Sequence, residues 1–189
     1  MNKTILLIIV CVFCSSCDPQ QFDITRENAL TLGDSNCAKE LDKWRPTAPD
    51  MAGFKSNCEM GRRLIDWGNT LPPGFDFYTL DLALNDAQTN VGIQDYRDKL
   101  TTIISSTSSI IYCVLPVTGP AYVGYSVDPY REAMSSICAN TIDPLDYNIN
   151  LDDRSSGPPD GKHLSKFERE VLASVYVDKY EKEKLAGFK

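Results

Sequence analysis

Three short polar segments contain residue types suited to nucleophilic catalysis. Gly33-Asp34-Ser35 comes first in the chain, Asn85-Asp86 follows, and Asp160-Gly161-Lys162-His163 lies near the C-terminus. His163 is the only histidine in the sequence. A serine hydroxyl becomes a useful nucleophile when a neighbouring base takes its proton, and histidine changes its protonation state near neutral pH. The three segments therefore predict a serine nucleophile served by a single imidazole.

Each segment can be given a part in acyl transfer. Ser35 is the predicted nucleophile, and His163 is the predicted base, which later returns the proton to the leaving group. Asp160 would orient the imidazole and stabilise its protonated form, because a tight turn at Gly161 presents both side chains together. The oxyanion of the reaction needs hydrogen-bond donors, for which the Asn85 side-chain amide and the Ser35 backbone N–H are candidates.

Alternating strands and helices must position these residues. Apolar runs predict strands at 29–32, 77–84 and 110–115. The intervening patterns predict helices at 36–45, 60–68, 94–105 and 129–140. A capping-box pattern, Ser165-x-x-Glu168, predicts the start of a last helix that runs to about Glu183. Segments 46–58 and 143–162 are predicted to be irregular, with a short strand near 148–151.

This alternation is typical of an α/β domain with a parallel sheet and helices on both faces. Sites in such sheets form at the carboxyl ends of the strands. Ser35 and Asn85 each follow a predicted strand, so we expect both at the same edge of the sheet. Asp81 interrupts the apolar run at 77–84, and a carboxylate there must be paired or lie near an edge or a cavity.

The order and spacing of the motifs resemble the SGNH (GDSL) hydrolase family over about residues 28–184. The segment 31–35 is similar to the family's first block, 83–86 to its Gly-x-Asn-Asp block with Ala83 in place of glycine, and 159–165 to its last block. The resemblance implies a three-layer α/β/α sandwich of the flavodoxin-like type, without a cofactor. It also implies that Ser35, Asp160 and His163 form a triad that hydrolyses acyl or acetyl esters through an acyl-serine intermediate.

The second block of the family is the least similar. The family has a glycine there whose backbone N–H joins the oxyanion hole. Counting back from Leu64 places Asn57 at that position, and the nearest glycines are Gly53 and Gly61. Asparagine tolerates left-handed backbone geometry better than most residues, so Asn57 is a candidate third donor. The departures at Asn57 and Ala83 leave open a second interpretation, a non-catalytic binding lipoprotein that has kept the fold.

The first 16 residues have the pattern of an export signal. Lys3 precedes nine consecutive apolar residues, a run too short to span a bilayer as a helix. Cys17 follows two serines, which resembles a bacterial lipobox with Cys14 in place of the usual leucine; ordinary secretion is the alternative. We therefore expect a signal peptide at 1–16, a lipidated Cys17 with a tether at 17–25, and one domain at 26–189. This predicts a protein held in the cell envelope by lipid and facing the periplasm or the cell exterior.

The cysteines agree with export. Of seven cysteines, two would leave with the signal and Cys17 would carry lipid, which leaves Cys37, Cys58, Cys113 and Cys138. An even number in an exported protein indicates disulfides, with three possible connectivities, of which we favour the local pairs Cys37–Cys58 and Cys113–Cys138. A metal site is the weaker alternative, because the one C-x-x-C pair straddles the predicted cleavage point and there is a single histidine.

Charge and composition restrict the partners. The net charge is −7 and no basic cluster is present, which argues against a nucleic-acid partner. We expect a monomer that acts on a small ester or an acetylated glycan, while peptidoglycan acetyl groups, thioesters and lysophospholipids stay open and anionic lipids are disfavoured. The loop at 116–126 either walls the substrate pocket or only connects two elements. A third interpretation, an exported interaction or immunity-type lipoprotein, leaves the ordered motifs unexplained.

Overall fold

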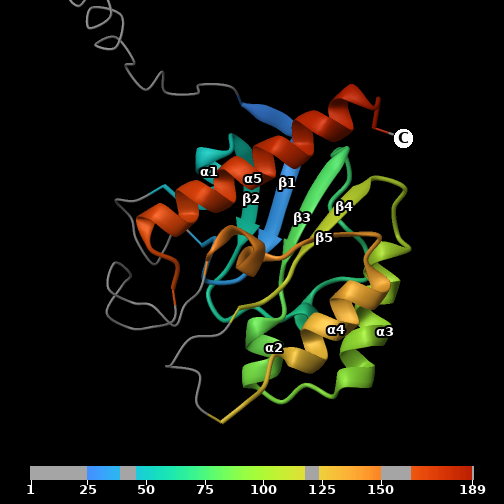
Figure 1. Cartoon of the computed structure of the whole chain (residues 1–189). Coiled ribbons are helices and arrows are strands. Elements are labelled where there is room, and N and C mark those ends of the chain that lie inside the picture. The colour runs from blue at the N-terminus through green and yellow to red at the C-terminus, as the bar shows by residue number, and fades with distance from the viewer. Residues whose placement is uncertain (1–24, 39–45, 118–123, 150–162, 189) are drawn as a thin grey trace, which may run out of the picture.

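The computed structural model of the chain describes residues 25–38, 46–117, 124–149 and 163–188. Its centre is a five-stranded parallel sheet with the strand order β2-β1-β3-β4-β5 (Figure 1). The strands are β1 (Arg26–Gly33), β2 (Phe54–Cys58), β3 (Phe77–Asp81), β4 (Ile110–Val114) and β5 (Asn140–Ile142). The helices are α1 (Ala48–Met51), α2 (Leu84–Gln88), α3 (Ile93–Ile104), α4 (Asp128–Ile137) and α5 (Lys166–Leu185), with 3₁₀ turns η2 (Leu64–Asp66) and η3 (Pro144–Tyr147).

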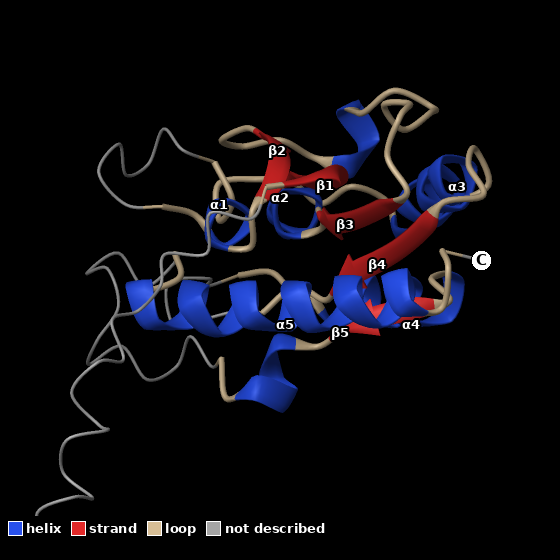
Figure 2. Cartoon of the chain, turned by 90° about the horizontal axis from the view of Figure 1, so that it is seen from above, coloured by secondary structure: helices blue, strands red, loops and turns tan. Residues whose placement is uncertain are grey.

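Helices cover both faces of the sheet and make three layers. Side chains of α1 and α5 share a core with Ala29, Phe77 and Tyr112 of the strands on one face. Side chains of α2, α3 and α4 share a second core with Leu32 and Leu80 on the other face. Figure 2 shows β4 between α5 and α3. The predicted three-layer α/β/α sandwich with a central parallel sheet is confirmed.

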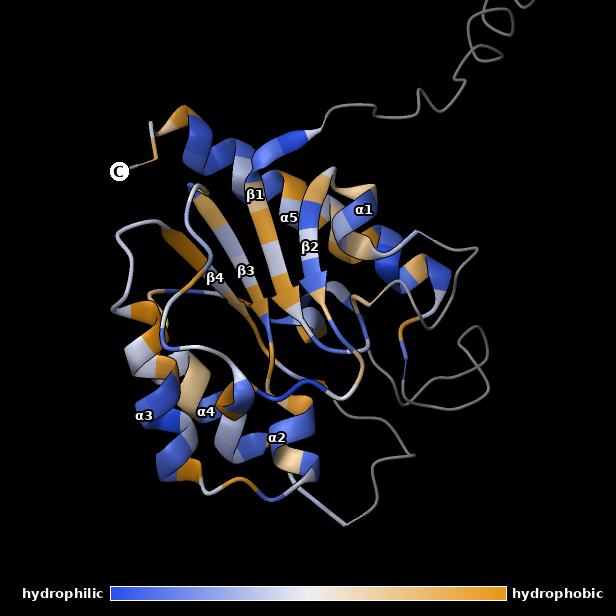
Figure 3. Ribbon diagram, turned by 180° about the vertical axis from the view of Figure 1, so that it is seen from behind, coloured by the Kyte–Doolittle hydropathy of each residue, from blue (hydrophilic) through white to orange (hydrophobic). Residues whose placement is uncertain are grey.

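Burial on both faces explains why the central strands read as nearly continuous apolar runs. Along β3, Phe77 contributes to the α5 core, whereas Tyr78 and Leu80 contribute to the opposite core. Such strands carry apolar residues at every position instead of at alternate ones. The edge strand β2 reads Phe-Lys-Ser-Asn-Cys and is more hydrophilic than β1, β3 and β4 (Figure 3).

Most predicted elements are found, but several segments differ from their predictions. The strand predicted at 77–84 ends at Asp81, and Leu84 begins the helix α2, which was not predicted. The predicted strands, the helices at 94–105 and 129–140, and the capped last helix correspond to β1, β3, β4, α3, α4 and α5. The prediction of an irregular 46–58 is wrong, since it contains α1 and the polar strand β2. The predicted helix at 60–68 is only the turn η2. The strand β5 begins at the end of the helix predicted at 129–140, and η3 lies in the segment 143–162 that was predicted to be irregular.

Other predictions fall wholly or partly outside the described residues. These are the signal peptide, the lipidated Cys17 with its tether, most of the helix predicted at 36–45, and Asp160. At 148–149 the described backbone is not a strand, because Asn148 ends η3 in the left-handed conformation. Within the described ranges, no helix is both long enough and apolar enough to cross a membrane.

Candidate active site

The strand order places a crevice where the three polar segments meet. The chain runs from β1 to one neighbour, β2, and then crosses to its other neighbour, β3, and ligands bind outside the carboxyl ends of strands at such a switch point. Ser35 lies in the turn that follows β1. Asn85 lies in the first turn of α2, four residues beyond the end of β3. His163 lies just before α5. The prediction that Ser35 and Asn85 share one edge is confirmed.

Ser35 and His163 contact each other although they are 128 residues apart in the chain. The Nε2 atom of His163 lies 3.2 Å from the Oγ atom of Ser35, and both residues are half-buried. This distance is within the range over which a base can take a proton from a hydroxyl nucleophile. The structure therefore brings together the predicted nucleophile and the predicted base. Asp160 lies outside the described residues, so its part in a triad stays a prediction.

Asn36 links the nucleophile turn to the segment that carries His163. The backbone N–H of Leu164 donates to the Asn36 side-chain oxygen over 3.4 Å. The backbone N–H of Asn36 in turn donates to a carboxylate oxygen of Asp34 over 3.0 Å. The capping box then starts α5, with the hydroxyl of Ser165 accepting from the Glu168 N–H. Sequence reasoning missed Asn36, and its place directly after the nucleophile is the signal that could have identified it.

The Ser35 backbone N–H is available for an oxyanion. Among the residues that the structure describes, none accepts a hydrogen bond from it, whereas the neighbouring Asp34 N–H donates to the backbone oxygen of Asp81 over 3.2 Å. The described residues 35–37 form a turn rather than a helix. The role of the Ser35 N–H as a donor stays a prediction.

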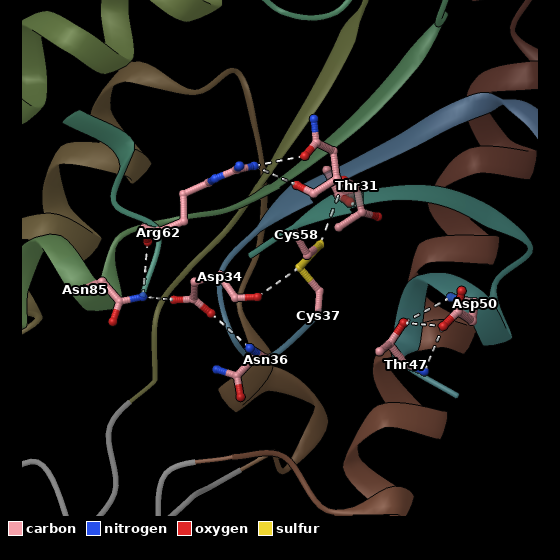
Figure 4. The surroundings of a disulfide bond; sticks show 11 residues. Thr31, Asp34, Asn36, Cys37, Thr47, Asp50, Cys58, Arg62 and Asn85 are labelled. Atoms are coloured by element: carbon pink, nitrogen blue, oxygen red, sulfur yellow. Dashed lines mark hydrogen bonds between the residues drawn. A yellow bond between two sulfur atoms is a disulfide. The ribbon is translucent and has the colours of Figure 1, made fainter. Parts of the chain in front are cut away.

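Asn85 and Asp86 brace the segment that follows β2. The Asn85 amide donates to an Asp34 carboxylate oxygen over 3.2 Å and to the Arg62 backbone oxygen over 3.1 Å (Figure 4). The buried Asp86 carboxylate accepts from the backbone N–H groups of Leu64 at 2.7 Å and Ile65 at 3.2 Å. Both Asn85 amide hydrogens are therefore engaged by the protein, and its predicted oxyanion role requires that one of them be shared.

Asn57 does not have the backbone geometry expected of it. It lies within β2, paired in register with Leu32, and it is absent from the residues with positive φ among those described. Its exposed side chain accepts from the Arg62 guanidinium over 2.9 Å. The left-handed backbone occurs instead at Gly61, in the loop after β2, with φ of 72°. The expectation of a left-handed Asn57 was wrong because β2 was not recognised as a strand.

Both predicted disulfides form. Cys37–Cys58 ties the turn after Ser35 to the end of β2 (Figure 4), and Cys113–Cys138 ties β4 to the residue that ends α4. The first disulfide passes so close to Gly33 that a Cβ at that position would lie 2.2 Å from the Cys37 sulfur. It thus fixes the nucleophile turn and the loop after β2 relative to each other.

Carboxylates dominate the electrostatics around the site. Burial, followed by the negative charge of Asp81, raises the pKa of Asp34 well above its usual range, and the N–H of Asn36 opposes this. Burial also raises the pKa of Asp86, against the two N–H groups that it accepts from. No group of three or more His, Cys, Asp or Glu side chains within the described ranges is arranged to hold a metal ion.

A pocket that is partly open to solvent lies beside the Ser35–His163 pair, and its accessible volume is about 20 Å³. Asn36 and Leu164, the residues that directly follow the nucleophile and the base, both line it. Its other walls come from the ends of β3 and β4, the loop after β4, and α5: Asp81, Leu84, Val114, Leu115, Pro116, Val117, Pro144, Ile149 and Leu172. The start of the predicted loop at 116–126 therefore walls a pocket, and Asp81 meets the prediction that it lies near a cavity.

Solved structures share this architecture. No protein-family model and no curated protein sequence matches the chain. A candidate SGNH hydrolase from Slackia heliotrinireducens is similar with a TM-score of 0.60 and 15% identity, over 80% of this chain and 97% of that one. A protein from Streptococcus pneumonia described as a candidate platelet activating factor has a TM-score of 0.59 and 17% sequence identity. The match covers 84% of this chain and 86% of that one. Est24, a carbohydrate acetylesterase from Sinorhizobium meliloti, has a TM-score of 0.55 and 14% sequence identity. The match covers 82% of this chain and 99% of that one.

These likenesses agree with the parallel sheet and its three layers. The chain has the fold of the SGNH hydrolases.

Proposed function

We propose that the protein is a serine esterase of the SGNH/GDSL type that hydrolyses carboxylic esters. The observation that carries the proposal is the contact of 3.2 Å between Ser35 Oγ and His163 Nε2 beside a pocket. A turn that is held by Asp34, Asn36 and a disulfide presents the serine, so little reorganisation is needed before reaction.

The geometry supports a two-step reaction. His163 takes the proton of Ser35 as Oγ bonds to the ester carbonyl carbon, and the carbonyl oxygen becomes an oxyanion near the Ser35 N–H. The bond to the alcohol oxygen then breaks, and the imidazolium gives its proton to that oxygen. Water repeats the sequence on the acyl-serine with the same base, which releases the acid and restores the serine.

A small acetyl ester is the substrate class that we propose. One structural neighbour is a carbohydrate acetylesterase, which supports an acetylated glycan as the substrate. The acidic composition of the chain, with a net charge of −7, disfavours anionic esters.

We further propose that Cys17 carries lipid and anchors the protein in the cell envelope, on the pattern of the first 17 residues. Cys17→Ser should then release the protein from the membrane fraction of expressing cells.

One observation favours a second candidate, a binding protein that has kept the fold. Both Asn85 amide hydrogens are used within the protein, which leaves fewer donors for an oxyanion. The two candidates differ in whether Ser35 reacts covalently.

Hydrolysis of p-nitrophenyl acetate, butyrate and octanoate by residues 18–189 tests the proposal. Ser35→Ala and His163→Ala should each lower kcat by about 1,000-fold or more, because each removes a member of one catalytic unit. Ser174→Ala, which changes an exposed serine on α5, serves as the matched control and should leave the rate unchanged. No hydrolysis and no fluorophosphonate labelling by the folded protein would instead support the binding protein.

A further inference from the structure

The pocket beside Ser35 contains a carboxylate for which the described part of the protein provides no hydrogen-bond donor. Asp81 ends β3 and is half-buried, and its side chain lines the pocket. Its backbone oxygen accepts from the Asp34 N–H, but its side chain has no such partner among the described residues. Burying a polar group without a hydrogen-bond partner is unfavourable for folding. A carboxylate in a pocket without such a partner therefore requires an explanation.

The carboxylate has no evident structural use. On the same face of β3, two residues earlier, the Thr79 hydroxyl forms a buried hydrogen bond of 2.7 Å with Thr31 of β1. That contact joins neighbouring strands, whereas among the described residues the Asp81 side chain forms no such contact. Burial raises the pKa of Asp81 to about 7, so its ionised form is disfavoured by its surroundings. A cation beside it would remove that penalty.

The surroundings of Asp81 suit a cation with an apolar body. The other lining residues are aliphatic or proline except Asn36, and neither lysine nor arginine is among them. The charge of Asp34 interacts unfavourably with that of Asp81, which makes the local field more negative. Apolar walls with one charged group give both contact area and orientation to a small ligand. An anionic ligand would be repelled by both carboxylates.

We propose that this pocket binds a small alkylammonium group of the substrate, with Asp81 as its counter-ion. Leu84, Val117 and Leu164 would contact the alkyl groups, and Asn36 at the rim would connect the pocket with the nucleophile turn. Asp81 is thereby a specificity-determining residue for esters that carry a positive charge. This inference rests on the proposed esterase function for its catalytic consequence, but the binding of the cation does not depend on catalysis.

Binding tests the proposal directly with two probes of the same shape. Choline and 3,3-dimethylbutan-1-ol differ in having a positively charged nitrogen or a neutral carbon at the branch point. Isothermal titration calorimetry with residues 18–189 should show choline binding about tenfold more tightly than the alcohol. Asp81→Asn should remove that preference. Asp76→Asn is the matched control, because it removes the same charge from an exposed residue just before the opposite end of β3.

Catalysis provides a second readout through the corresponding acetate esters. The ratio of kcat/KM for acetylcholine to that for 3,3-dimethylbutyl acetate should be about ten in the wild type and in Asp76→Asn, and near one in Asp81→Asn. A general loss of activity cancels in this ratio. Asp81→Ser replaces the asparagine variant if the latter does not fold, as judged by circular dichroism.

Equal affinity of the wild type for choline and for 3,3-dimethylbutan-1-ol would overturn the proposal. A preference for choline that persists in the Asp81 variants would also overturn it. Failure of the esterase proposal looks different: the folded wild type would then hydrolyse no p-nitrophenyl ester, or Ser35→Ala would hydrolyse p-nitrophenyl acetate as fast as the wild type. In that case the calorimetric comparison still decides whether Asp81 binds a cation.

Discussion

The sulfur of Cys37 occupies the space where residue 33 would place a β-carbon. A Cβ built on Gly33 would lie 2.2 Å from that sulfur, and 3.2 Å from the backbone oxygen of Asp81 on the neighbouring strand. The glycine of the first motif is therefore required by close approach and not by an unusual backbone angle, since Gly33 is not among the residues with positive φ. It lets a disulfide cross the end of β1, two residues from the nucleophile.

Gly33→Ala should lower the free energy of unfolding by about 2–4 kcal/mol, because neither the disulfide nor the β3 backbone can move freely away from the added methyl group. Urea denaturation monitored by fluorescence measures this. Gly68→Ala is the control: its nearest neighbour would be 3.9 Å away, so its effect should stay within about 0.5 kcal/mol. Equal effects of the two substitutions would contradict the close approach at Gly33.

The two disulfides should differ in their effect on activity but not in their effect on stability. They separate their cysteines by 21 and 25 residues, so the double variants Cys37→Ser/Cys58→Ser and Cys113→Ser/Cys138→Ser should each lose about 2–4 kcal/mol of stability. Only the first pair is next to the nucleophile turn. We therefore expect its kcat for p-nitrophenyl acetate to fall about tenfold or more, against less than about threefold for the second pair. A larger kinetic loss in the Cys113/Cys138 variant would refute this assignment.

Asp86→Asn should loosen the segment that Asn85 also holds. The substitution replaces one of the two acceptors for the Leu64 and Ile65 N–H groups by a donor, inside a fully buried site. We expect a loss of about 2–4 kcal/mol in the free energy of unfolding, together with faster hydrogen exchange at both amides. Asp66→Asn, which changes an exposed carboxylate paired with Arg63 in the same turn, should cost less than about 1 kcal/mol. Similar costs for both variants would show that Asp86 does not anchor the segment.

Asp81 should make folding stability depend on pH. Its pKa is raised to about 7 in the folded protein and is near 4 in an unfolded chain, so between these values the folded state binds the additional proton. Stability is then lost as the pH rises from about 4 to about 7, and is constant with respect to this group above that range. Relative to the wild type, Asp81→Asn should gain about 1–2 kcal/mol between pH 4 and pH 7.5, less than the full shift implies because the carboxylate is half-buried.

Thermal and urea denaturation of both proteins at several pH values measure this difference. Asp76→Asn, which changes an exposed carboxylate near the other end of β3, is the control variant. If the difference between wild type and Asp81→Asn is the same at pH 4 and pH 7.5, Asp81 does not titrate between them.

The sequence by itself left three pairings of the four cysteines open, but it determined the fold class and the order of the motifs. These features are local: strands that are buried on both faces, such as β3 and β4, must be apolar throughout, and Ser165 and Glu168 cap α5 within one turn. Because parallel strands end at one edge, the placement of Ser35 and Asn85 at the same edge also followed from the alternation of strands and helices.

Only the tertiary structure decided which partners these side chains use. β2 was missed because an edge strand with one covered face can be polar, and with it the backbone of Asn57 was misjudged. The contacts of Asn36 with Leu164 and of Asn85 with Asp34 join residues 128 and 51 positions apart, and no local pattern encodes such distances. Asp81 could be recognised in the sequence as misplaced in a strand, but whether it met a partner or a pocket depended on how β3, β4 and α5 pack around it.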